Sequence, residues 1–96
     1  MLALRVLAQA PVHGYAIAQR IHQLSSEVLQ VEEGSLYPAL QKMLLKGWVK
    51  AEWTTSETGR QVRVYHITAA GRKQLDAEVA EYRRVNGAIE ALLQSA

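Results

Sequence analysis

Apolar residues recur along the first half of this 96-residue chain at helical spacing, and then at the spacing of strands. Residues 2–9 predict a short helix, which should end near Ala10 because Pro11 disfavours helical geometry in the residue before it. A second helix is predicted from Tyr15 to about Leu24, since its apolar side chains share one face. The brief apolar run Val28–Val31 could form a short strand.

A third helix is predicted from Ser35 to Lys46, with Gly47 as its terminator. One face of this helix is apolar and should pack on the core: Leu36, Leu40, Met43 and Leu44. Pro38 tests this register, because a proline costs about 3 kcal/mol in a helix interior but is tolerated in the first turn. With Ser35 as the N-cap, Pro38 falls within that first turn.

After the third helix the polar and apolar residues alternate, as they do in half-buried strands. Two such segments, residues 48–54 and 61–68, flank a polar stretch that contains Gly59 and suits a hairpin loop. The two segments are therefore predicted to form a two-stranded ribbon.

Thr68 is placed to cap a last, long helix from about Ala69 to Leu93. The order of elements predicts an α+β fold that is mainly α with a small β-hairpin. This is a winged helix-turn-helix with an added C-terminal helix. We expect residues 1–68 to form a DNA-binding domain and residues 69–96 a dimerisation helix, in one compact unit.

Composition excludes several classes of function. The chain has no Cys, and therefore no disulfide framework and no Cys-based zinc site. Its three histidines lack metal-ligand spacing beside a carboxylate, and no catalytic triad or Gly-rich phosphate loop can be named. We therefore expect neither an enzyme nor a metal or other cofactor. The apolar residues 1–10 are too short to span a bilayer and lack the features of a leader, which favours a cytoplasmic protein without membrane contact.

The charge of the chain is unevenly distributed, although the net charge is only +2. Between Ser35 and Lys73 lie seven basic and two acidic residues, whereas the rest of the chain has four basic and seven acidic residues. A positive middle with negative flanks is typical of a protein that presents one face to phosphates. The plainer alternative is a scatter of solvated Lys and Arg side chains.

The third helix carries polar residues away from its leucines, and these are the candidate DNA contacts: Ser35, Tyr37, Pro38, Gln41, Lys42 and Lys46. The N-terminal end of such a helix enters the major groove in helix-turn-helix proteins. Ser35 and Tyr37 can donate hydrogen bonds to phosphate oxygens. Gln41 can bond bidentately with adenine, and Lys42 can reach a guanine edge or a phosphate. The alternatives are packing of Tyr37 on a neighbouring loop and simple solvation of the other side chains.

The hairpin adds two candidates, Arg60 at its tip and Arg63 behind the tip. Arginines on a ribbon can pair with phosphates along the backbone or enter a minor groove, which gives affinity without base specificity. The alternative is an ordinary hairpin that arginine keeps soluble.

The last helix has a seam of heptad spacing, formed by Leu75, Val79, Tyr82, Asn86, Ile89 and Leu93. A lone Asn at a seam position commonly fixes register and partner number. A helix that projects from so small a domain has little core of its own to cover, so a second copy is the expected partner. The resulting dimer would place two reading helices roughly 34 Å apart and favour a near-palindromic operator. The alternative is a helix that folds back on its own domain.

Four motifs together resemble the PadR family of bacterial transcriptional regulators: HGYAI at His13–Ile17, GSLYPAL at Gly34–Leu40, KGWV at Lys46–Val49 and YHITAAGRKQL at Tyr65–Leu75. The resemblance implies a winged-helix DNA-binding domain with a C-terminal dimerisation helix, usually in a repressor that a small molecule or stress signal relieves. It also implies that Ser35, Tyr37 and Pro38 begin the recognition helix, and that Gly59 and Arg60 belong to the wing.

The sequence also departs from the family pattern. Relatives often have several more residues before the first helix, and their wing strand is commonly more basic and richer in tyrosine than VRVY at residues 62–65. Some relatives bind flat aromatic drugs with a tryptophan on the last helix, whereas the tryptophans here are Trp48 and Trp53 on the ribbon. That ligand mode cannot be transferred to this chain.

We therefore predict a dimeric, sequence-specific DNA-binding repressor whose partners are double-stranded DNA, a second copy of the chain and a small-molecule effector. The competing interpretation is a winged-helix module that binds protein instead of nucleic acid. Such a module would keep the hydrophobic pattern without needing the basic residues between Ser35 and Lys73.

Overall fold

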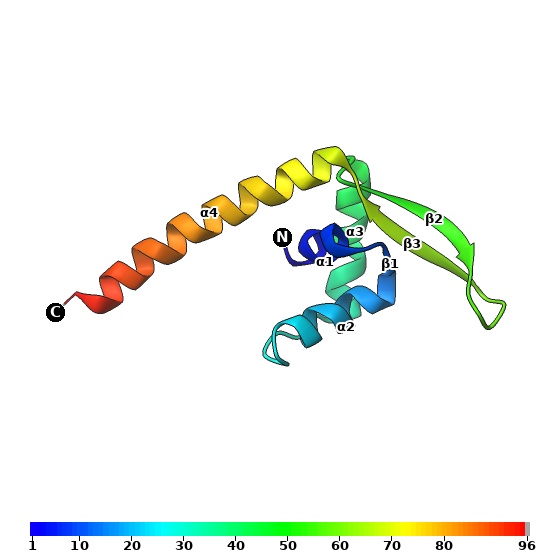
Figure 1. The fold of residues 1–96 in the computed structure, drawn as a ribbon, viewed down its shortest axis with the longest axis horizontal. Coiled ribbons are helices and arrows are strands. Elements are labelled where there is room, and N and C mark those ends of the chain that lie inside the picture. The colour runs from blue at the N-terminus through cyan, green and yellow to red at the C-terminus, as the bar shows by residue number, and fades with distance from the viewer. Residues whose placement is uncertain (96) are drawn as a thin grey trace.

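The computed structural model describes residues 1–95, which form four helices and a three-stranded antiparallel sheet. The elements in chain order are α1 (Leu2–Gln9), β1 (Val12–His13), α2 (Gly14–Leu24), α3 (Glu33–Leu45), β2 (Val49–Thr55), β3 (Gln61–Ile67) and α4 (Ala69–Gln94). In Figure 1 the first three helices cluster together, the β2–β3 hairpin projects to one side and α4 to the other. The molecule measures 60 × 28 × 22 Å. The arrangement confirms the predicted α+β winged helix-turn-helix.

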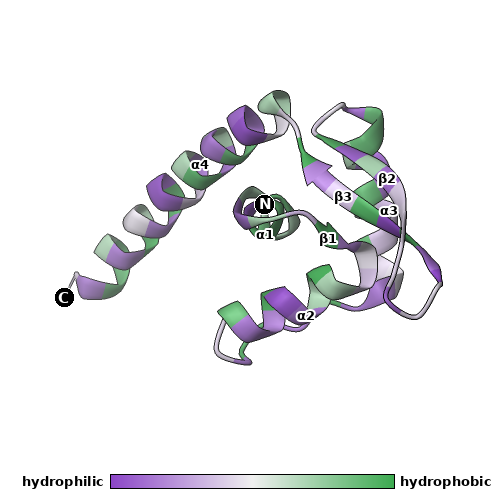
Figure 2. Ribbon diagram, turned by 45° about the vertical axis from the view of Figure 1, so that its right-hand side comes forward, coloured by the Kyte–Doolittle hydropathy of each residue, from purple (hydrophilic) through white to green (hydrophobic). Residues whose placement is uncertain are grey.

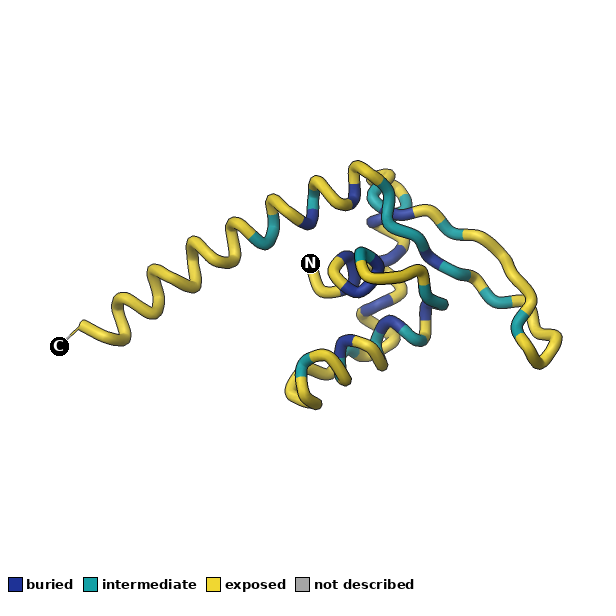
Figure 3. Tube along the Cα trace, in the orientation of Figure 1, coloured by how far each residue is buried: buried dark blue, intermediate teal, exposed yellow. Residues whose placement is uncertain are grey.

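The hydrophobic core lies among α1, α2 and α3 and continues to the base of the sheet and the start of α4. Its most completely buried large side chains come from all three of these helices: Leu4, Leu7, Ile17 and Leu40. Each of them lies on the buried face of its helix, and burial of that face removes apolar surface from water. Figure 3 shows that α4, by contrast, is exposed over most of its length.

The sheet has the strand order β1–β3–β2, and β1 was not predicted from the sequence. The two predicted segments pair as a hairpin, and their register runs from Val49 opposite Ile67 to Thr55 opposite Gln61. The additional strand pairs Val12 with Tyr65 and thereby joins the start of α2 to the hairpin. Two residues are too few to show an alternating pattern.

The strand considered at Val28–Val31 is wrong, because this segment is a loop. Ser26 and Glu27 have positive φ angles of 54° and 68°, which turn the chain back onto the end of α2. There the backbone of Leu29 is bound at both polar groups. Its N–H donates to Ser25 Oγ at 3.0 Å, and its carbonyl accepts from His22 Nδ1 at 3.0 Å. These two hydrogen bonds attach the segment to the end of α2, so it does not pair as a strand.

Helix α3 begins two residues earlier than predicted, so Ser35 is not its N-cap. The N-cap is Glu32, whose carbonyl accepts the N–H groups of Ser35 and Leu36 at 3.0 Å. Pro38 consequently lies inside the helix and not in its first turn. Its missing N–H leaves the carbonyl of Gly34 without the usual helical donor. Because Gly34 is exposed, water can satisfy that carbonyl, which explains why the helix continues through the proline.

Gly47 ends α3 as predicted, with a φ of 76°. The N–H of Gly47 donates to the Leu44 carbonyl at 3.1 Å, and the N–H of Trp48 donates to the Met43 carbonyl at 3.0 Å. This pair of bonds is the Schellman arrangement, which needs a left-handed residue and so favours glycine. It turns the chain directly from α3 into β2.

Thr68 caps α4 as predicted and also joins α4 to the end of α3. Its Oγ1 accepts the Gly71 N–H at 3.0 Å and donates to the Gly47 carbonyl at 2.6 Å. Its own N–H donates to the Trp48 carbonyl at 3.0 Å. A β-carbon at Gly71 would overlap this same carbonyl oxygen and lie 2.8 Å from Ile67 Cγ1. The first turn of α4 can therefore approach the turn after α3 only because residue 71 has no side chain.

We expect Gly71→Ala to destabilise the protein by about 1–3 kcal/mol, because the added methyl group forces a backbone displacement. Gly87→Ala is the matched control, since this glycine is in the same helix and has open space around its α-carbon. It should stabilise the protein by up to about 1 kcal/mol through helix propensity. Urea unfolding followed by circular dichroism measures both changes. Equal effects of the two substitutions would contradict the packing described here.

Candidate nucleic-acid interface

Helix α3 buries one side and exposes the other. Of the predicted core face, Leu36, Leu40 and Met43 are buried, and Leu44 is partly buried and packs against the core. All six polar or special residues singled out on this helix and at its end are exposed: Ser35, Tyr37, Pro38, Gln41, Lys42 and Lys46. A helix that packs its leucines inward necessarily turns these positions outward, because the two sets alternate at helical spacing.

The six residues do not form one narrow face. Ser35 and Lys42 line a hollow of about 530 Å³ on the side of α3 that faces α1 and α4, where Glu78 also lies. Burial tends to raise the pKa of Glu78, but a hydrogen bond from Gln74, the terminal amino group at 3.1 Å and the charge of Lys42 hold that pKa below its usual value. Lys42 therefore interacts with a carboxylate of its own chain.

Tyr37 lies on the opposite flank of α3, against the start of α2. An ideal β-carbon at Gly14 would be 3.1 Å from Tyr37 Cε1 and 3.2 Å from Tyr65 Cε2, so both rings close over this glycine. Tyr37 nevertheless keeps 44% of its surface exposed. The ring thus packs on a neighbouring segment, which was the alternative considered from the sequence, and part of it stays open to solvent.

The phenol of Tyr37 is a hydrogen-bond donor over the whole neutral range. Partial burial raises the pKa of Tyr37 above its ordinary value of 10.0, and the negative charge of Glu33 and the neighbouring Tyr65 raise it further. The hydroxyl therefore stays protonated. A protonated phenol can donate a hydrogen bond to an anionic oxygen such as that of a phosphate.

The β2–β3 hairpin ends in a tight loop that carries Arg60. The Ser56 N–H donates to the Arg60 carbonyl at 2.7 Å, the Arg60 N–H donates to Ser56 Oγ at 3.2 Å, and Gly59 has a φ of 80°. Arg60 is exposed at this tip and borders a surface hollow together with Tyr15 from α2. These hydrogen bonds fix the backbone of the loop, and the Arg60 side chain stays exposed to solvent.

Arg63 lies behind the tip of the hairpin, three residues after Arg60, and is close to two aromatic rings. Its guanidinium carbon is 6.0 Å from the ring centroid of Trp53 and 5.7 Å from that of Tyr65. Together with Tyr37, these three residues line a hollow of about 360 Å³. The structure therefore brings Tyr37 and Arg63 to one place, at some distance from Arg60.

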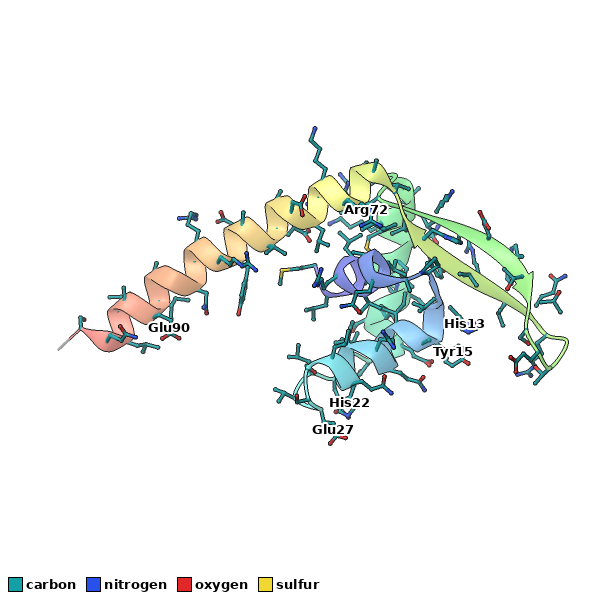
Figure 4. The ribbon with its side chains drawn as sticks, in the orientation of Figure 1. His13, Tyr15, His22, Glu27, Arg72 and Glu90 are labelled. Atoms are coloured by element: carbon teal, nitrogen blue, oxygen red, sulfur yellow. The ribbon has the colours of Figure 1, made fainter. Side chains whose placement is uncertain are left out.

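Three aromatic residues at this surface were missed by the sequence reasoning, namely His13, Tyr15 and Trp53. The His13 and Tyr15 rings stack at 5.3 Å, and Figure 4 shows both at the start of α2. Helix α2 has no side-chain cap at this end. Trp53 lies opposite Arg63 in the hairpin; the sequence predicted the ribbon but not its register, so the two residues were not placed together. The proximity of His13 and Tyr15 to the hairpin depends on β1 and had no local signal.

The Lys and Arg side chains between Ser35 and Lys73 form no ion pairs among residues 1–95. The ion pairs there join the terminal amino group to Glu78, His66 to Glu52 and Arg84 to Glu81. Lys42 is the one of these basic residues whose charge acts on a carboxylate, that of Glu78. The other basic charges are available to a polyanion.

The seam on α4 is only partly exposed. Leu75 is buried in the core of its own chain and Val79 packs against that core, so these two positions serve the domain itself. Farther along, large apolar side chains face solvent: Tyr82, Val85, Ile89, Leu92 and Leu93. Figure 2 shows hydrophobic residues continuing to the far end of α4. These apolar side chains are exposed on a helix that no other element of residues 1–95 covers there, and large exposed apolar patches are characteristic of interaction surfaces.

Within residues 1–95, no cluster of three or more His, Asp or Glu side chains is arranged to bind a metal ion. None of the helices there combines the length and the apolar character that crossing a membrane would require.

Three packed helices followed by a β-hairpin define a winged helix-turn-helix protein, with α3 in the position of the recognition helix and the hairpin as the wing. Residues 3–77 match the family model described as the transcriptional regulator PadR-like family. The chain therefore belongs to the PadR-like family of transcriptional regulators.

Several relatives illustrate this membership. An uncharacterized 37.1 kDa protein in transposon TN4556 of Streptomyces fradiae is 39% identical over 93% of this chain. The aligned region makes up 24% of the length of that larger protein. A PadR-like transcriptional regulator from Bacillus cereus is 28% identical, with a TM-score of 0.82 over 98% of this chain and 89% of its own. Bacillus subtilis PadR, solved in complex with operator DNA, shares the fold at 21% identity and a TM-score of 0.70, over 79% of this chain and 42% of its own.

The Tyr37 environment can be tested directly. Replacing Glu33 with Gln should lower the pKa of Tyr37 but leave it above the ordinary value, because burial is the larger cause of the shift. Glu32→Gln serves as the control, since that neighbouring carboxylate is not among the causes. NMR titration of ring-labelled tyrosine measures the pKa. An unchanged value in Glu33→Gln would show that the carboxylate does not face the phenol.

Proposed function

We propose that the protein is a dimeric, sequence-specific DNA-binding repressor of transcription that responds to a small-molecule or stress signal. The observation that carries this proposal is the placement of exposed donors and unpaired basic residues on α3 and the adjoining hairpin. The complex of Bacillus subtilis PadR with operator DNA supports the same partner for this fold. Such a protein would act in the bacterial cytoplasm.

In this proposal α3 enters the major groove and the hairpin lies along the flanking backbone. Gln41 is exposed and takes part in none of the ion pairs or side-chain hydrogen bonds given above. It is the candidate reader of adenine. Tyr37, Lys46 and the two wing arginines would bind phosphates. Ser35 and Lys42 would contact the other edge of the groove, because they lie on the flank of α3 nearer α4.

The partner proposed for the exposed row on α4 is the α4 of a second copy. A two-fold dimer through this row would present two copies of α3 to successive major grooves, roughly 34 Å apart, on a near-palindromic operator. Asn86, which is exposed at a seam position, would fix the register of the pair. A signal that changes the direction of α4 would change the half-site spacing and thereby release the DNA. Sequencing genomic fragments captured by the purified protein would identify the operator.

DNA binding is tested with Tyr37→Ala and Arg60→Ala in a mobility-shift titration on a captured duplex. Both variants should bind more weakly, and Arg60→Ala should also reduce the slope of log affinity against log salt by about 0.9, since one phosphate contact is lost. Arg83→Ala on α4 is the control, because its charge lies outside the proposed surface. Full affinity in both test variants would leave the proposal without support.

The same titration separates DNA binding from a protein-binding module. Affinity that depends on phosphates falls steeply as salt rises, whereas an apolar protein interface barely responds to salt. A wild-type protein that binds no duplex, or binds one without salt dependence, would favour the module.

Dimerisation is tested by Ile89→Lys, which places a charge within the exposed row on α4. We expect it to shift the protein toward a monomer in sedimentation equilibrium, because a charge buried between apolar surfaces is costly. Ala91→Lys is the matched control, since helical spacing puts residue 91 on the opposite side of α4. Dissociation by both variants, or by neither, would contradict the assigned face.

A further inference from the structure

The wing holds one arginine between two aromatic rings, behind its tip. Trp53 lies opposite Arg63 in the β2–β3 register, and Tyr65 is two residues further along β3 on the same face. The guanidinium carbon of Arg63 is 6.0 Å from the Trp53 centroid and 5.7 Å from the Tyr65 centroid. Both distances are within the range of cation–π attraction. Arg63 is thereby restrained, although its side chain is exposed.

The two rings differ in what else they do. Tyr65 is buried, with 5% of its surface exposed, and belongs to the core that supports the sheet. Trp53 keeps 67% of its surface exposed and is not part of that core. A large aromatic side chain that is so exposed contributes little to folding by burial. The interaction that the structure shows for the Trp53 ring is its cation–π contact with the Arg63 guanidinium.

The restrained arginine borders the same hollow as the Tyr37 ring. Tyr37 reaches this place from α3 because Gly14 allows its ring to lie close to that of Tyr65. Two donors from separate elements, a protonated phenol and a guanidinium, therefore border one exposed hollow of about 360 Å³. Neither forms an ion pair among the residues described. An anionic oxygen cluster is the group that such a pair of donors would bind.

We propose that Trp53 and Tyr65 position the Arg63 guanidinium beside the Tyr37 hydroxyl, so that the wing and α3 contact the same DNA phosphate. The proposal rests on the DNA binding proposed above. In it Trp53 is a positioning residue that acts through Arg63 without touching the phosphate. Holding a planar guanidinium in one orientation before binding reduces the rotamer freedom that the complex must remove.

A thermodynamic cycle tests the positioning role. Trp53→Leu should weaken binding to a captured duplex by about threefold, which corresponds to a surface cation–π contact. It should leave the salt slope unchanged, because no charge is removed. Arg63→Gln should reduce the slope by about 0.9, and Trp53→Leu should have no further effect in the Arg63→Gln background. Trp53→Tyr, which keeps an aromatic ring, should restore most of the affinity.

Two controls exclude trivial causes. Lys50→Gln removes one charge from the other face of β2. It should leave the affinity and the salt slope unchanged, whereas Arg63→Gln should change both. Thermal unfolding should be unchanged in Trp53→Leu, since this ring is largely exposed.

The shared phosphate is tested by replacing phosphates of the duplex one at a time with neutral methylphosphonates. One position should weaken binding of the wild-type protein, and both Tyr37→Phe and Arg63→Gln should be insensitive to replacement at that position. Insensitivity at two different positions would overturn the shared contact. An equal effect of Trp53→Leu with and without Arg63 would overturn the positioning role. Failure of the wild-type protein to bind any duplex would instead overturn the proposed function, and this inference with it.

Discussion

The carbonyl group of Trp48 is the point on which the relative placement of the helices and the wing depends. It accepts the Thr68 N–H at 3.0 Å, and the bare α-carbon of Gly71 packs against it. Thr68 Oγ1 simultaneously binds the Gly47 carbonyl. These contacts join four segments at one place: the end of α3, the start of β2, the end of β3 and the first turn of α4. A side chain at position 71 would separate them.

This junction has a mechanical consequence for the proposed regulation. Helix α4 contacts its own domain through Leu75 and Val79 and stands free of it beyond these residues. A change in the direction of α4 would therefore be transmitted at Thr68 and Gly71, where the helix meets the end of α3 and the base of the wing. Recognition helix and wing would move together relative to a partner copy. The tip of the hairpin, which is bound only by its own loop, would follow passively.

Local patterns predicted the elements whose causes are local. Gly47 and Thr68 were placed correctly because a left-handed terminator and a hydroxyl cap act within a few residues of the chain. β1 was missed, since its two residues become a strand only when Tyr65 lies beside them. Ser35 was assigned as an N-cap by residue type, but Glu32 begins the helix and Pro38 lies in its interior. Likewise, the meeting of Tyr37 with Arg63 results from tertiary packing over Gly14, which sequence spacing cannot reveal.

The early start of α3 also changes how its N-terminal end can interact with phosphates. Glu32 and Glu33 stabilise the helix because negative charge is favourable beside the positive end of the dipole. The same carboxylates repel a phosphate, so the helix end itself is a poor anion site. A neutral donor such as the Tyr37 phenol avoids part of this repulsion, and the Glu33 carboxylate raises the pKa of that phenol further above its ordinary value. In the proposed complex, the positive charge at this edge comes from another element. Arg63, which the wing holds beside the same hollow, is placed to supply it.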